Sequence, residues 1–141
     1  MIKKVFTMVV LFIILLHPQM DYAVRYQQIE IFDPIQNKVV KVVETNKDIN
    51  DMVVGWINGI DGFYSEVDPI KDDGYAIRFP LNHSIQVQNQ WLKTTVKEVY
   101  VIIPENNPPL FLVFETEDKL VSFPFKDDIT NLSKVLNFKL R

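Results

Sequence analysis

The sequence predicts an α+β domain. We expect an antiparallel sheet, built from an N-terminal hairpin and a C-terminal meander, with one amphipathic helix packed on it and a short C-terminal helix. Three observations support this fold class: two β-branched segments flank an early turn, one strongly periodic helical stretch follows, and short strands separated by turn residues complete the chain. Because strands do not alternate with helices, a parallel sheet is not expected.

The first two strands are expected to pair as a hairpin. Tyr26–Phe32 reads YQQIEIF, which places Ile29 and Ile31 on one face of a strand. Asp33-Pro34 opens a turn, and the β-branched segment Val39–Glu44 reads as the return strand.

The amphipathic helix is expected over Lys47–Ile60. Thr45 and Asp48 form a T-x-x-D capping pair before it. Gly59 and Gly62 lie at its end, where a left-handed cap favours glycine. The apolar residues recur at spacings of three and four and form one stripe that is expected to face the core, with Trp56 buried: Ile49, Met52, Val53, Trp56, Ile57 and Ile60.

The rest of the chain is expected to form the meander and the final helix. After the connecting segment Phe63–Gly74, strand patterns occur at Tyr75–Leu81, Ser84–Gln88, Thr95–Ile103, Leu110–Glu115 and Leu120–Phe125. A short helix over Asp128–Leu136, with Asp127 as its N-cap, is expected to end the domain.

The N-terminal 23 residues have the character of a targeting segment, and residues 24–141 form the single domain. Lys3 and Lys4 precede the apolar run Val5–Leu16, which is shorter than the roughly 20 residues of a spanning helix. This pattern predicts a secretory signal cleaved after Ala23. An uncleaved anchor over residues 3–16 is the alternative, because Asp21 stands where a small residue is preferred.

Composition excludes several classes of function. The net charge is −3, and the lysines are scattered singly, so neither a nucleic-acid partner nor an anionic membrane surface is expected. Contact with a membrane is expected only through an uncleaved N-terminal segment. The chain has no cysteine, which removes disulfides, thiol nucleophiles and zinc-thiolate sites. No phosphate-binding loop or nucleophile elbow is present, and no cofactor is expected.

A few residues are candidates for binding. Trp91 lies in a polar turn, outside any clean strand or helix period, so it either covers the sheet edge or contacts a partner. Leu110 and Phe111 follow the proline-rich turn Pro104–Pro109 and are candidates for exposed apolar surface.

Catalytic and metal-binding candidates are weaker. Asp68, Asp72 and Asp73 form the densest acidic group, but their spacing does not match a calcium loop, so a solvated turn is the simpler interpretation. His83 stands alone, and its sequence neighbours point to opposite faces of a strand, which gives no catalytic relay. No catalytic residue is assigned.

The chain resembles short exported proteins of unknown function from Gram-positive, Bacillus-type bacteria. The likeness rests on the signal Met1–Leu16, the hairpin sequence Tyr26–Glu44 and the segment Trp56–Leu81, WINGIDGFYSEVDPIKDDGYAIRFPL. The resemblance implies an extracytoplasmic location and no catalytic residues.

Two functions remain open. The first is a non-catalytic binding or interaction module at the cell envelope, with an envelope or extracellular protein as its partner. The alternative is a small hydrolase that acts on cell-wall or sugar polymers through Asp and Glu. Two carboxylates converging in a pocket would favour the hydrolase, whereas an apolar patch or an open strand edge would favour the binding module.

The targeting segment gives the first testable prediction. Edman sequencing of the extracellular product should begin near Val24, because cleavage is expected after Ala23. A full-length, membrane-held protein would support the anchor instead. A soluble cytoplasmic protein that retains Met1 would contradict both forms of export.

Overall fold

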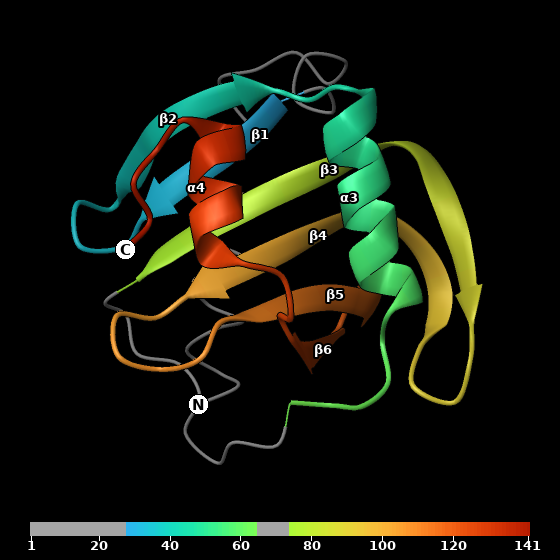
Figure 1. Ribbon diagram of the computed structural model, residues 1–141. Helices are drawn as coiled ribbons and strands as arrows, with labels where there is room; N and C mark the ends of the chain where they lie inside the picture. The colour runs from blue at the N-terminus through green and yellow to red at the C-terminus, as the bar shows by residue number, and fades with distance from the viewer. Residues whose placement is uncertain (1–27, 65–73) are drawn as a thin grey trace.

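The computed structural model describes residues 28–64 and 74–141, and these form one antiparallel sheet with two helices (Figure 1). The strands follow the spatial order β2-β1-β3-β4-β5-β6. The α+β fold class, with its hairpin, meander and two helices, is confirmed. The elements are β1 (Gln28–Asp33), β2 (Lys38–Glu44), α3 (Lys47–Asn58), β3 (Tyr75–Gln88), β4 (Lys93–Ile103), β5 (Leu110–Thr116), β6 (Lys119–Pro124) and α4 (Ile129–Leu136).

Both helices lie on the same face of the sheet, as Figure 1 shows. The main core lies between them and the strands, because each element contributes its apolar side there. Ile29 and Ile31 of β1 are fully buried in this core, as their alternation predicted. From α3 and α4 the core receives Ile49, Val53, Ile57, Leu132 and Leu136.

Two of the predicted strands are a single strand. Tyr75–Leu81 and Ser84–Gln88 join into β3, whose pairing with β4 shifts between Pro80 and Ile85. β1 pairs with β3 only as far as Arg78, so beyond this residue that edge of β3 is open. Pro80 fits there because proline has no backbone N–H to pair with a neighbouring strand. Asn50 of α3 accepts a hydrogen bond from the Asn82 backbone N–H at 3.0 Å.

The helix caps differ from those predicted. Asn46, rather than the Thr45 pair, caps α3: its side-chain oxygen accepts the Ile49 N–H at 2.9 Å. Asparagine in an extended conformation is a stronger N-cap than threonine, which explains the one-residue shift. The helix ends at Asn58, and Gly59 follows with φ −87°, so the predicted left-handed cap is absent there.

The C-terminal helix is also capped one residue later than expected. Asp128, and not Asp127, accepts the Thr130 N–H at 2.8 Å. Asn137 ends α4 in the left-handed conformation, with φ 49°. Asp127 is therefore available for a different contact, described below.

The second face of the sheet contains a buried ion network. Glu30 of β1 lies opposite Arg78 of β3, and Arg78 lies opposite Tyr100 of β4. The Arg78 guanidinium donates to Glu30 through Nε and to Glu98 through Nη1, the latter at 3.2 Å. Tyr100 donates its hydroxyl to the same Glu98 oxygen at 3.1 Å. One guanidinium thus connects the three central strands.

Arg78 is fully buried, so its charge depends on these partners. Burial lowers the pKa of the guanidinium, but the hydrogen bond to Glu30 and the charges of Glu98 and Glu30 outweigh that effect and raise its pKa above the usual value. In the strand alternation of β3, Arg78 lies on the opposite face from Ile77 and Phe79. A buried pair of this kind is costly to break because one partner is left charged and unpaired.

Replacing the guanidinium should therefore be strongly destabilising. Arg78→Met should lower the free energy of unfolding by about 3–5 kcal/mol, as loss of one buried ionic partner does, measured by urea denaturation. Adding Glu30→Gln and Glu98→Gln should recover much of that loss, because no unpaired carboxylate then remains in the network. A single variant within about 0.5 kcal/mol of wild type, the range of surface changes, would contradict the account.

Candidate binding site

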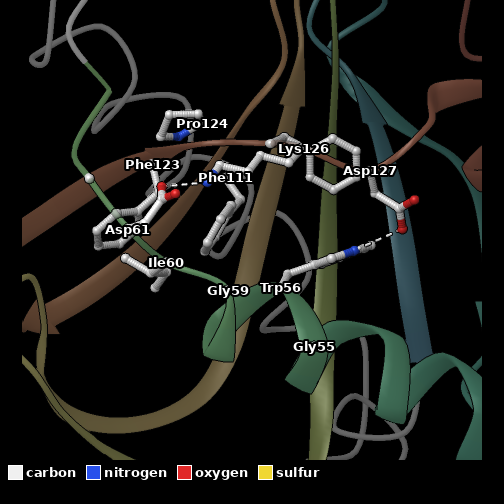
Figure 2. Close-up of a pocket in the computed structure, with 12 residues that line it drawn as sticks. Gly55, Trp56, Gly59, Ile60, Asp61, Phe111, Phe123, Pro124, Lys126 and Asp127 are labelled. Carbon is white, nitrogen blue, oxygen red and sulfur yellow. Dashed lines mark hydrogen bonds and ion pairs between the residues drawn. The ribbon is translucent and has the colours of Figure 1, made fainter.

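A cavity of about 210 Å³ lies between the end of α3 and the edge of the sheet formed by β5 and β6. Figure 2 shows its walls. One wall is the last turn of α3 and the residues that follow it. The other wall comes from Phe111 of β5, Phe123 and Pro124 of β6, and the segment leading to α4.

Glycines leave part of the α3 wall open, beside the side chains of Trp56, Ile60 and Asp61. Gly55 and Gly59 stand four residues apart, so they lie on the same side of the helix, and Gly62 follows them. A Cβ atom added to Gly55 or Gly62 would meet no atom within 4 Å. Three of the four glycines in the chain therefore line this cavity.

Aromatic rings line both sides of the cavity, Trp56 from α3 itself and the phenylalanines from the sheet side. Trp56 packs edge-on against Phe79, with ring centroids 5.1 Å apart, and against Phe125 at 4.9 Å. Phe111 and Phe123 lie side by side at 5.2 Å. These centroid separations lie within the range that aromatic pairs prefer, so the rings stabilise one another where they line the cavity.

Polar groups line the remaining part of the cavity. The Trp56 indole donates Nε1–H to Asp127 at 3.0 Å, and Lys126 forms an ion pair with Asp61 (Figure 2). The hydrogen bond and charge of Lys126 lower the pKa of Asp61, which keeps this carboxylate ionised. Trp56 was expected to be buried but is half-buried, because part of its side chain lines the cavity.

Of the three residues predicted to bind a partner, two are buried and the third, Trp91, is half-buried. Leu110 and Phe111 are buried, 0% and 3% exposed, so the expectation that they present apolar surface is wrong. The reason is that β5 pairs with strands on both sides and has a core on each face. Leu110 faces the side without helices, whereas Phe111 faces the helices and lines the cavity.

Trp91 lies near the same aromatic wall. It is half-buried and packs edge-on against Phe63, with ring centroids 5.2 Å apart. Phe63 stacks on Phe123 at 5.9 Å and remains 50% exposed. The rings of Trp91, Phe63 and Phe123 thus form a continuous apolar row from the β3–β4 turn to the cavity.

The remaining sequence candidates do not form a site. Asp68, Asp72 and Asp73 lie outside the described residues. His83 is exposed on β3. Within residues 28–64 and 74–141, no three histidine or acidic side chains come together to hold a metal ion.

A second opening, of about 430 Å³, lies where β4 and β5 diverge. These strands pair only from Tyr100–Leu112 to Ile102–Leu110, and Glu98 and Glu115 line the gap beyond. Glu98 already accepts from Arg78 and Tyr100. The hydrogen bonds from Lys119 and from the Lys93 backbone lower the pKa of Glu115, which makes it a poor general acid.

The sequence interpretation missed Gly55, Asp61, Lys126 and Asp127 as site residues. One signal was available: a glycine inside a strong helical stripe costs stability, and its presence there often has a packing or functional reason. The contact between Trp56 and Asp127 spans 71 positions in the sequence, so no local pattern could indicate it.

Comparisons with protein-family models, with curated proteins and with solved structures gave no match. Among the described residues, neither helix is long and apolar enough to span a membrane.

The glycines of the α3 wall lead to a stability prediction with an internal contrast. Gly55→Ala should raise the free energy of unfolding by about 0.5–1 kcal/mol, because the added methyl meets open space and alanine favours the helix. Gly74→Ala should instead destabilise the fold, since its Cβ would lie 1.8 Å from the Ile103 carbonyl oxygen. Thermal denaturation of both variants measures this. A destabilised Gly55→Ala would mean that the space beside α3 is filled.

Proposed function

We propose that this chain is a non-catalytic binding module of the cell envelope that holds one side chain of a partner protein in the cavity beside α3. The observation that carries the proposal is the combination of open space at the glycines with aromatic rings that line the same cavity. The volume of about 210 Å³ is below the roughly 300–1,000 Å³ of small-molecule sites, and it suits a single side chain.

The surroundings of the cavity also suit a protein partner. Hot spots at protein interfaces are pockets that bury one anchor residue within a ring of contacts that exclude water. Phe63 is half exposed beside the cavity, and Trp91 packs against it, so both can extend such a contact over the surface. The Lys3–Leu16 segment favours an extracytoplasmic location for the encounter.

The carboxylates support a hydrolase less well. Asp61 and Asp127 both line the cavity, but Asp61 pairs with Lys126 and Asp127 accepts the Trp56 indole hydrogen. A general acid needs a raised pKa, whereas the pKa of Asp61 is lowered. Binding is therefore the function that the geometry favours.

Blocking the cavity should separate binding from folding. Gly55→Leu places a branched side chain in the open space, so the tagged variant should lose the proteins that wild type captures from intact cells. Its melting temperature should stay equal to or above that of wild type, because leucine favours the helix.

Asn58→Leu is the matched control. It adds an exposed leucine to the same helix without lining the cavity, so capture should persist. Equal capture by wild type and Gly55→Leu would show that the cavity is not the binding site.

A further inference from the structure

The sheet has a second core, on the face opposite the helices. Strand alternation turns its side chains away from α3 and α4, which both lie on the other face (Figure 1). They come from β1, β3, β4 and β5, and they are almost completely buried, 0–1% exposed: Phe32, Ala76, Tyr100, Ile102, Leu110 and Leu112.

The residues that the structure describes do not account for this burial. A sheet face that borders water keeps its side chains accessible, whereas these six have lost nearly all contact with solvent. Within residues 28–64 and 74–141, no helix packs on the second face, and Tyr64 is the one residue outside the strands that joins its apolar cluster. The cover therefore comes from residues 1–27 or 65–73.

Composition decides between these two segments. Residues 65–73 read SEVDPIKDD, with four carboxylates and one lysine, so they offer only Val67 and Ile70 to an apolar surface. Burying those carboxylates without partners would be costly. Residues 1–27 contain the run Val5–Leu16, in which eleven of twelve residues are apolar. Burial of such a run against apolar side chains is favourable in proportion to the area removed from water.

The length of the chain lets this run reach the whole second face. β1 begins at Gln28, and the eleven residues 17–27 separate it from the run. An extended chain spans about 3.3 Å per residue, so these residues reach up to about 36 Å. β5 lies three strands from β1 in the sheet, which is about 14 Å at the usual strand spacing. The run can therefore lie over every strand of the second core.

We propose that the N-terminal apolar run Val5–Leu16 docks on the second face of its own sheet and completes the second core. The segment that the sequence predicts to direct export then has a second role, as a cover for the domain. Its withdrawal, by insertion into a membrane or by cleavage after Ala23, uncovers an apolar surface that the full chain keeps closed. This inference does not depend on the cavity beside α3, which lies on the helix side of the sheet.

Photo-crosslinking within the full chain tests the docking. The photoreactive residue p-benzoylphenylalanine replaces Phe114, a half-buried ring that packs against the second core, so the change in shape is small. Irradiation of the purified chain should give an intramolecular product, and mass spectrometry should place the crosslink within residues 5–16. The matched control replaces Phe138, a half-buried ring on the helix side, and should give no crosslink to that run.

A substitution inside the run gives an independent readout. Leu11→Asp places a carboxylate in the run, and in the full chain it should lower the melting temperature by several degrees, because a carboxylate cannot be buried without a partner and the second core loses its cover. Gln19→Asp makes the same change in charge outside the run and should leave the melting temperature nearly unchanged.

Two results would overturn the inference. A crosslink from position 114 to residues 65–73 or to a second molecule, with none to residues 5–16, would show that something else covers the second face. Equal melting temperatures for Leu11→Asp and wild type would show that the run is not packed on the domain. The Gly55→Leu capture experiment probes the helix side, so its outcome and these are independent.

Discussion

The fold depends on the register of its three central strands, and the buried Arg78 fixes that register. Its guanidinium bonds to Glu30 on β1 and to Glu98 on β4, and both carboxylates are correctly placed in only one alignment. Slipping a strand by one residue would turn its side chains to the opposite face. A slip of β3 would therefore place the charged guanidinium, without a partner, among the apolar side chains beneath the helices. That costs far more free energy than misplacing an aliphatic residue.

The site follows from this register. With Arg78 on one face, its neighbour Phe79 must face the helices, where it supports Trp56. The same alternation, carried along β5 and β6, turns Phe111 and Phe123 to the helix side. These side chains pack against α3. At the end of α3 the glycines have no side chains to cover Phe111 and Phe123, which therefore line the cavity. The cavity thus forms where bulky aromatic side chains lie beside glycines, which have no side chain.

Local periodicity was sufficient to predict most of the architecture. Ile29 and Ile31 alternate with polar neighbours, and the stripe from Ile49 to Ile60 recurs every three or four residues, so one face of each element is apolar. The caps were displaced by one residue because Thr45 and Asn46 compete for the same role, and only the backbone conformation decides between them. β3 appeared as two strands because Pro80 and the polar residues after it interrupt the alternation without ending the strand.

The site was harder to predict because its contacts are distant in sequence. Leu110 and Phe111 looked alike as candidates, yet strand alternation sends them to opposite faces, and only Phe111 reaches the cavity. Nothing local in the sequence indicates that Arg78 will be paired with Glu30, which lies 48 positions away. Asp61, Lys126 and Asp127 are surface charges in ordinary turns until the fold brings them to one rim.

The central claim is that the partner meets this protein at the cavity and not at a free sheet edge. Photo-crosslinking in intact cells tests it directly, with a photoreactive residue at Gly62, which lines the cavity and has open space around it, or at Val42 on the edge strand β2. Val42 is 45% exposed and offers an equally accessible position. The account predicts a discrete crosslinked product from position 62 and none from position 42. The same product from position 42 alone would contradict it and indicate that the partner adds a strand to the sheet.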